Sequence, residues 1–217
     1  YYAGLRAGDV MLLTLGDAVI GDGEIWIEIQ HGKTPAARRR IGLHLLAPEP
    51  VCQLIRETYD RRRGEFRESS NLRRISLFGP EGVPDGYTRN ALIDTAIAEL
   101  QTRFGINTVF HSLRHAFASW ILVRWYALRY PETIEVLVAR RHAIFQPEAQ
   151  ARLAELFTLG SAQTTNPDDP SALIVISKIM GHLGQQTLFA RYVHTFDILH
   201  ADAMKRVDTV FGVQHVS

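Results

Sequence analysis

The side chains with the clearest capacity for chemistry include a histidine and an arginine in the stretch His-Ser-Leu-Arg-His, residues 111–115. His111 and Arg114 are three residues apart, so both emerge on one face if this stretch is helical. A guanidinium beside an imidazole provides donors suited to a phosphate group. For this pair taken alone, a histidine near a helix N-terminus and a surface arginine are the more ordinary interpretation.

Two further motifs lie towards the C-terminal end of the chain. Gly181-His182 is typical of a helix end, from which the imidazole would project at a defined backbone position. Tyr192 follows ten residues after His182, within an amphipathic stretch. Taken separately, the histidine is typical of a structural turn residue and the tyrosine of a half-buried core residue.

The N-terminal part of the chain adds Arg6, in Gly-Leu-Arg-Ala-Gly-Asp, and Lys33, which lies between two predicted strands. Separately, these are typical of a helix-capping charge and a solvated turn residue. Together, two arginines, a lysine, two histidines and a tyrosine supply the groups for phosphoryl transfer without a metal. Positioned cations stabilise charge on the phosphate oxygens, a tyrosine oxygen acts as covalent nucleophile, and a lysine protonates the leaving hydroxyl.

The elements that must position these groups are a small sheet and several helices. Residues 24–30 predict a strand, because Ile25, Ile27 and Ile29 alternate onto one face. A second strand around residues 40–43 would complete an antiparallel hairpin with Lys33 at its tip. The fold class is therefore predicted to be mainly α with a small antiparallel β-hairpin or sheet.

Hydrophobic spacing and turn residues predict the helices. Pro50 begins a short helix, and Gly105 and Gly181 end two others. Residues 131–160 are predicted to be helical, although their apolar residues show no clear helical phase. Residues 64–87 and 161–170 are predicted to be loops. The helices that end at Gly105 and Gly181 cover residues 88–104 and 170–180, and two more are predicted at residues 111–128 and 186–194.

Composition narrows the class of protein. The chain has 217 residues, of which 46% are hydrophobic and 22% charged, and a formal net charge of +1. No apolar run approaches the roughly 18 residues that a membrane span requires, and the N-terminus lacks the features of a signal peptide. A single cysteine, Cys52, excludes an internal disulfide and a cysteine-based zinc site. Basic runs at residues 38–40 and 61–74 permit DNA binding without establishing it.

Taken in order, these motifs resemble those of the tyrosine recombinase or phage integrase family. The resemblance extends from Gly4 to about His194 and includes a hairpin lysine before an arginine-rich strand. It implies the catalytic-domain fold of that family. It also implies site-specific cleavage and rejoining of DNA through a 3′-phosphotyrosyl link, with no ATP, metal or other cofactor.

The resemblance also implies a role for each motif residue. Arg6 and Arg114 would clamp the scissile phosphate, and His182 would hydrogen-bond one of its oxygens. Tyr192 would be the nucleophile, with His111 assisting its proton transfer. Lys33 would protonate the 5′-hydroxyl leaving group. Supporting roles are expected for Asp9, where the family more often has glutamate, and for His115 and His194.

At the level of domains, residues 1–217 are expected to form one catalytic domain from a longer polypeptide, without its N-terminal DNA-binding domain. An insertion at about residues 128–170 is expected to contact DNA or another protomer, or to be inert. Residues 195–217 are expected to form a tail that packs on a neighbouring protomer. The expected partners are double-stranded DNA carrying a specific recombination site and further copies of the chain, as a tetramer. The expected setting is the cytoplasm, in association with the nucleoid, for a protein encoded by a bacterium, a phage or another mobile element.

Two other functions are compatible with the same residues. A type IB topoisomerase would use similar chemistry but relax DNA instead of exchanging strands. A DNA-binding module could keep the fold without turnover, for instance because the insertion blocks the site.

Overall fold

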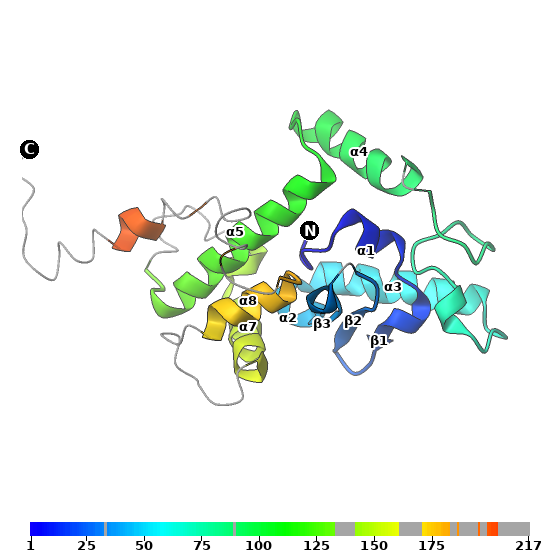
Figure 1. The fold of residues 1–217 in the computed structure, drawn as a ribbon, viewed down its shortest axis with the longest axis horizontal. Coiled ribbons are helices and arrows are strands. Elements are labelled where there is room, and N and C mark those ends of the chain that lie inside the picture. The colour runs from blue at the N-terminus through cyan, green and yellow to red at the C-terminus, as the bar shows by residue number, and fades with distance from the viewer. Residues whose placement is uncertain are drawn as a thin grey trace, which may run out of the picture.

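A three-stranded antiparallel sheet lies between helices in the computed structural model (Figure 1), which describes residues 1–32, 34–88, 90–132, 142–160, 171–182, 186, 195 and 199–203. The strands are β1 (Ala18–Ile20), β2 (Ile25–Ile29) and β3 (Arg39–Gly42), in the order β1-β2-β3. Ile27 pairs with Ile41 and Ile29 with Arg39. The predicted β2–β3 hairpin is confirmed, while the short strand β1 was not predicted.

Helices make up most of the rest of the described chain, which confirms the mainly helical class. The α-helices are α1 (Ala7–Met11), α2 (Leu43–Leu46), α3 (Glu49–Glu65), α4 (Thr95–Phe104), α5 (Phe110–Arg129), α7 (Pro147–Gly160) and α8 (Ser171–Ile179). Shorter helical turns are η1 (Leu15–Asp17), η2 (Pro35–Ala37), η3 (Leu72–Arg74), η4 (Asn90–Asp94) and η6 (Ala143–Phe145). Within the described ranges, no helix combines the length and the apolar character that crossing a membrane requires.

Helix α3 is longer than predicted, and the loop after it correspondingly begins later. Its second half is stabilised by polar contacts, including a 2.7 Å ion pair between Arg61 and Glu65. The fully buried guanidinium of Arg62 donates to the carbonyls of Ser76 and Val83 in the following loop. Apolar spacing does not reveal the full length of this helix, because these contacts involve charged residues.

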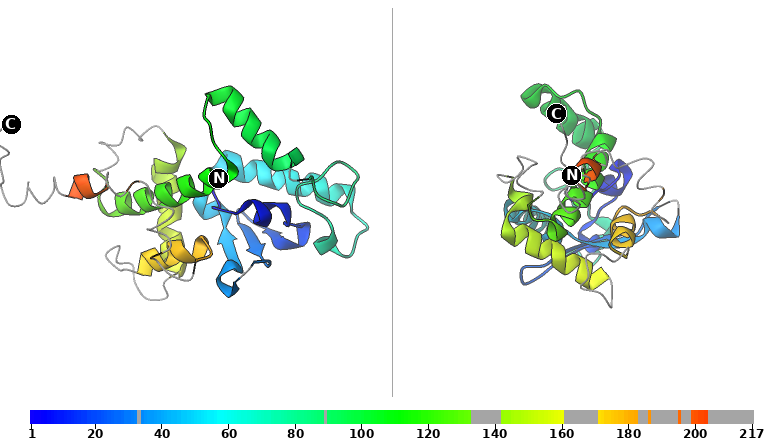
Figure 2. Two further views of the ribbon diagram at one scale, coloured as in Figure 1. Left: turned by 45° about the horizontal axis from the view of Figure 1, so that its top comes forward. Right: turned by 90° about the vertical axis from the view of Figure 1, so that its left-hand side faces the viewer.

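Helix α4 projects away from the sheet in both views of Figure 2. None of its residues is buried, and Phe104 at its end is 60% exposed. Gly105 ends the helix in the left-handed conformation, with φ of 64°, as the sequence predicted. A side chain at this position would be strained, so glycine is the natural stop.

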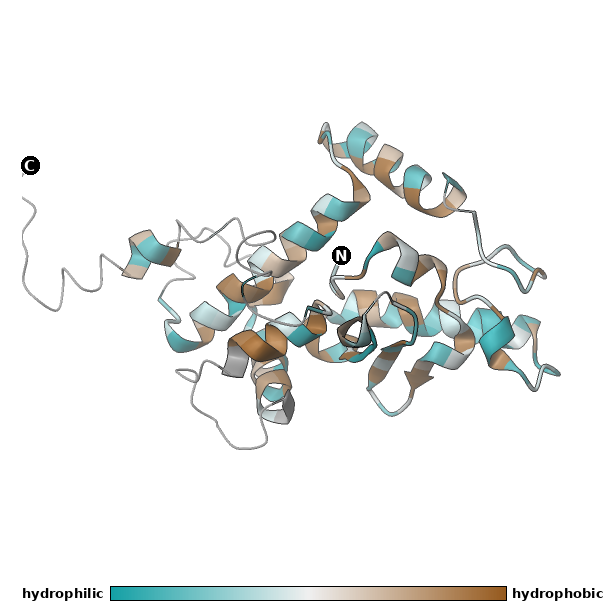
Figure 3. Ribbon diagram, in the orientation of Figure 1, coloured by the Kyte–Doolittle hydropathy of each residue, from teal (hydrophilic) through white to brown (hydrophobic). Residues whose placement is uncertain are grey.

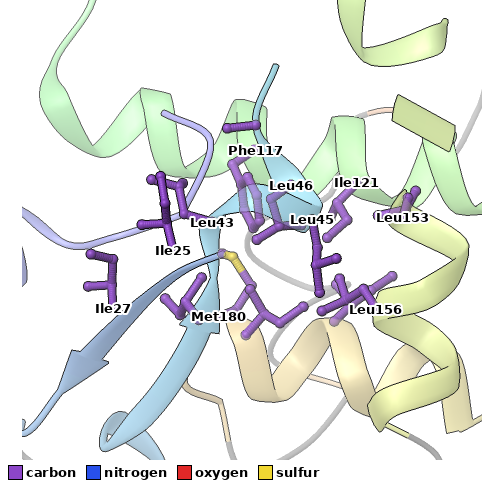
Figure 4. Close-up of a cluster of buried hydrophobic side chains, with 14 of the residues drawn as sticks. Ile25, Ile27, Leu43, Leu45, Leu46, Phe117, Ile121, Leu153, Leu156 and Met180 are labelled. Atoms are coloured by element: carbon purple, nitrogen blue, oxygen red, sulfur yellow. The ribbon is translucent and has the colours of Figure 1, made fainter. Parts of the chain in front are cut away.

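The hydrophobic core lies between the sheet and helices α2, α5, α7 and α8 (Figure 4). Helix α8 is apolar over most of its length in Figure 3, and Ile176 and Met180 are fully buried. Helix α7 lies within the predicted insertion and packs into this core through Leu153 and Leu156. The described part of that segment therefore includes a structural helix of the domain.

Candidate active site

Arg114 lies at the centre of the candidate site, in the first half of α5. Its side chain is buried, with 1% of the residue exposed. Nη1 donates to the carbonyl of Gly4, and Nη2 donates to the carbonyl of Met180. Nη2 also lies 3.1 Å from Nε2 of His182. One guanidinium thus connects the N-terminal segment to the end of α8.

His182 is held by the way in which α8 ends. The backbone N–H of His182 donates to the Ser177 carbonyl at 2.9 Å, and that of Gly181 donates to the Lys178 carbonyl at 2.9 Å. This hydrogen-bond pair defines a Schellman motif, which requires a left-handed residue after the helix. Gly181 adopts this conformation, with φ of 67°, so the predicted helix end is confirmed. The motif directs the imidazole of His182 into a buried position beside Arg114.

The segment that carries Arg6 passes directly against α5. Gly4 has a φ of 57°, and a Cβ atom there would lie 2.4 Å from Phe117 on α5, so a larger residue does not fit. Asp9 caps helix α1 by accepting the backbone N–H of Arg6 at 3.1 Å. The side chain of Arg6 is half-buried. Close packing and capping together fix the backbone on both sides of Arg6.

The two histidines of the α5 motif lie nearer the surface. His111 is exposed and His115 is half-buried, and their rings meet edge to face with centroids 4.8 Å apart. Burial and the charges of Arg114 and Arg6 lower the pKa of His111. His111 therefore belongs to the same electrostatic environment as the two arginines, although it is far more accessible than Arg114.

Burial and the charge of the cluster both act on His182. Burial, followed by the charges of Arg114, Arg6 and Arg39, lowers its pKa to about 4. The imidazole is consequently neutral at pH 7. An anion bound among these cations would oppose their effect and raise the pKa of His182.

Arg39 belongs to this cluster but was not predicted as a site residue. It appeared in the sequence only as part of a basic run. Strand alternation was the available signal, because Arg39 and the buried Ile41 lie on the same face of β3. Its side chain is 5% exposed and forms a 3.0 Å ion pair with Asp9.

A cavity of about 570 Å³ adjoins His182 between β3, α7 and α8. Its rim includes three exposed basic side chains, Arg38, Arg40 and Lys178. The guanidinium of Arg40 lies over the ring of Trp26, 4.4 Å from the ring centroid. No acidic side chain is among the described residues that line this cavity. In the same ranges, no group of three His, Cys, Asp or Glu side chains could hold a metal ion.

Three predicted site residues, Lys33, Tyr192 and His194, lie outside the described residues. The residues that flank the Tyr192 segment are described, and both sides contact α5. His182 precedes the segment, and Thr195 follows it with its hydroxyl donating to the Ser119 carbonyl at 3.4 Å. Further along, Asp202 accepts a 3.2 Å hydrogen bond from the hydroxyl of Tyr126.

The structure therefore brings together the described members of the predicted site. They share one cluster built from three separate parts of the chain: the start of α1 with the residue before it, the first half of α5 and the turn after α8. The members are Arg6, Asp9, His111, Arg114, His115 and His182. Arg39 on β3, which was not predicted as a site residue, joins the same cluster.

Of three comparisons with known proteins, one found a match. The model of the phage integrase family matches residues 1–129, which is more than half of the 217 residues. The match includes Arg6, His111 and Arg114, whereas His182 and Tyr192 lie beyond it. Neither the curated proteins nor the solved structures contain a match. On the family match, the chain belongs to the phage integrase family.

Proposed function

We propose that this chain is the catalytic domain of a site-specific DNA recombinase or integrase, with Tyr192 as its covalent nucleophile. The observation that carries the proposal is the contact of Arg114 with His182, close to the charges of Arg6 and Arg39. Membership of the phage integrase family indicates recombinase activity in general. The cluster explains how this chain would hold a phosphate.

Phosphate binding follows from the donors and charges of the cluster. Among its described residues, the guanidinium groups of Arg6, Arg39 and Arg114 are accompanied by one carboxylate, Asp9. The surplus positive charge favours an anion, and attack on a phosphodiester increases the charge on its non-bridging oxygens. In this proposal Arg6 and Arg114 neutralise that charge, and the neutral imidazole of His182 donates a hydrogen bond.

Covalent chain length supports Tyr192 as the nucleophile. It lies three residues before Thr195, so their Cα atoms are at most about 11 Å apart, since adjacent Cα atoms are 3.8 Å apart. The Thr195 hydroxyl donates a hydrogen bond to the Ser119 carbonyl. Ser119 is five residues after Arg114, which is roughly 7.5 Å along the helix. The chain length therefore allows Tyr192 to reach the cluster, as the proposal requires.

Each step of the proposed reaction replaces one phosphate ester bond with another. The Tyr192 oxygen attacks phosphorus, its proton passing towards His111, and the bond from phosphorus to the 5′-oxygen breaks. Lys33 protonates the departing 5′-oxygen. A 5′-hydroxyl from the same or another strand then attacks the phosphotyrosine and releases Tyr192. Because the ester bond is retained, resealing requires neither ATP nor a new activated group.

The proposed partners are double-stranded DNA and further copies of the chain, assembled as a tetramer. The expected protomer-linking tail begins at residue 195, yet Leu199 is buried and Asp202 contacts Tyr126 of the same chain. The contact with a neighbouring protomer is therefore proposed for residues 204–217, which lie outside the described residues.

Covalent capture from a pool of randomised DNA tests the proposal without requiring a defined recombination site. The full-length protein is incubated with randomised duplexes that carry a nick, so that cleavage releases a short fragment and traps the adduct. Wild-type protein should become linked to DNA, and Tyr192→Phe should not. Tyr59→Phe, on α3, is the matched control and should behave as wild type.

Three results would contradict the proposal in different ways. An adduct that persists in Tyr192→Phe would exclude this residue as the nucleophile. DNA binding by the wild type without any adduct would favour a catalytically silent DNA-binding module. Relaxation of supercoiled DNA without strand exchange would favour an activity of the type IB topoisomerase kind.

A further inference from the structure

Each of the three guanidinium nitrogens of Arg39 donates a hydrogen bond to another residue of the chain. Its Nε donates to the Ile179 carbonyl at 2.7 Å, and its Nη1 donates to the Ala37 carbonyl at 2.7 Å. Its Nη2 donates to Oδ2 of Asp9 at 3.0 Å. All three nitrogens of the guanidinium are thus committed to protein acceptors, and the side chain is 5% exposed.

Two of the three acceptors of Arg39, the Asp9 carboxylate and the Ile179 carbonyl, belong to the segments that also supply acceptors to Arg114. Oδ2 of Asp9 accepts both Nη2 of Arg39 and the backbone N–H of Arg6. Position 39 is therefore linked through one oxygen atom to the backbone that presents Arg6. The Ile179 carbonyl lies at the end of α8, three residues before His182.

Close packing at Gly181 strengthens this second link. A Cβ atom built at Gly181 would lie 2.9 Å from Nη1 of Arg39 and 3.3 Å from the Ala36 carbonyl oxygen. The guanidinium consequently rests against the left-handed turn that directs His182 towards Arg114. A displacement of Arg39 would move this turn as well as the Asp9 carboxylate.

We propose that Arg39 is a positioning residue of the active site, which holds the Arg6 segment and the His182 turn in register around Arg114. This inference rests on the proposed function, because it assumes that the cluster binds the scissile phosphate. Arg39 acts through Asp9 and the α8 end and does not contact the phosphate itself. Its planar group bonds in three directions at once, which a lysine cannot reproduce.

Two other arginines of this chain provide matched controls. Arg40 is the next residue on β3, but its side chain is exposed and lies over Trp26. Arg62 is fully buried and also bonds to backbone carbonyls, in the loop after α3. Arg40→Gln controls for loss of a positive charge near the site, and Arg62→Lys controls for general loss of stability.

The first experiment measures the single-turnover cleavage rate on captured DNA, together with the Kd for that DNA. Arg39→Lys and Arg39→Gln should slow cleavage about 10²-fold, because misplacing catalytic groups by about 1 Å has effects of that size. The Kd for DNA should change less than threefold in the Arg39 variants, and Arg40→Gln, which removes a charge from the cavity rim, should slow cleavage at saturating DNA far less than they do. Equal cleavage rates in wild type and in folded Arg39 variants would overturn the inference.

A double-mutant cycle with Asp9→Asn separates positioning from general destabilisation. If Arg39 acts through Asp9, Arg39→Gln combined with Asp9→Asn should cleave no more slowly than the worse single variant. Fully multiplicative rate losses would contradict that route. The route would also be contradicted if Arg39→Gln and Arg62→Lys lost the same cleavage rate for the same drop in melting temperature.

Binding of inorganic phosphate distinguishes failure of the inference from failure of the proposed function. Phosphate should shift the imidazole NMR signals of His182 in full-length wild type, and Arg39→Gln should weaken this binding about tenfold, by analogy with residues that orient ligands from behind a site. This titration does not involve Tyr192 or cleavage. A wild type that binds phosphate through His182 but forms no DNA adduct would refute the proposed function alone. Unchanged phosphate affinity in Arg39→Gln would refute the inference alone.

Discussion

The two halves of helix α5 each contain a buried arginine, and the two arginines have different surroundings. In the first half, Arg114 contacts His182 and lies close to the charge of Arg6. In the second half, Arg124 donates to the carbonyls of Leu46 and Ala149, at 2.9 and 3.0 Å. Both guanidinium groups bond to backbone carbonyls, and both residues are less than 5% exposed.

The two arginines differ in the groups that surround them, and this difference separates a candidate site from a structural contact. Arg124 and Gln150 bond to each other, so this half of α5 is connected to α2 and α7 through neutral groups. Burial lowers the pKa of Arg124 to about 10, and the charge of Arg152 on α7 also lowers it. Around Arg114, by contrast, His182 and the charges of Arg6 and Arg39 converge from other segments, and His111 lies on the same helix. The grouping of donors, rather than the burial of one arginine, points to an anion.

The largest effect is expected when Arg114 is removed. Arg114→Ala should slow single-turnover DNA cleavage by about 10²–10³-fold, the usual loss when one donor to a transition-state oxyanion is deleted. Rates are compared per folded molecule, with Arg124→Met as the control from the other half of the helix. A larger rate loss in Arg124→Met than in Arg114→Ala would reverse the assignment of the two halves.

Removing Arg124 should instead reduce stability. Arg124→Met leaves the Leu46 and Ala149 carbonyls without this donor, and each unsatisfied buried group costs about 1–3 kcal/mol. The free energy of unfolding should therefore fall by about 2–4 kcal/mol, as measured by urea denaturation, while cleavage per folded molecule stays within twofold. Unchanged stability would show that water or other groups replace the guanidinium.

His182 should make the first half of α5 sensitive to acid. Its pKa in the folded state is about 4, against an ordinary value of 6.5, so the unfolded chain takes up this proton first as the pH falls. Its contribution to stability is therefore complete above pH 6.5 and is progressively lost between pH 6.5 and 4. Urea denaturation over this range should show a shallower decline for His182→Gln than for wild type. The prediction would be contradicted if the free energy of unfolding fell equally steeply with pH in wild type and His182→Gln. Inorganic phosphate should raise the pKa of His182.

The smallest effect is expected from the hydroxyl of Tyr126 in the second half of α5. Tyr126→Phe removes the 3.2 Å hydrogen bond to Asp202 and should lower stability by about 0.5–1.5 kcal/mol. Amide hydrogen exchange should accelerate in residues 199–203, and cleavage should change less than twofold. Cleavage reduced tenfold or more would assign this half of the helix a part in catalysis.

Much of the backbone around the site was predictable from local patterns. Alternating isoleucines predicted β2, Gly105 and Gly181 predicted two helix ends, and the motif around Arg114 predicted a helix close to the observed α5. Each of these features depends on residues within a few positions of one another, which is why sequence spacing revealed them.

The order of the six motif residues along the chain resembles that of a known family. The family match over residues 1–129 confirms that the chain belongs to it. Only the tertiary structure decided that Arg114 is buried, that Arg39 belongs to the site, and that α7 is part of the core. The physical reason is that these features arise from contacts between distant residues: 68 positions separate Arg114 from His182, and 140 separate Arg39 from Ile179. Periodicity records which face of an element is apolar, but it does not record which distant segment that face will meet.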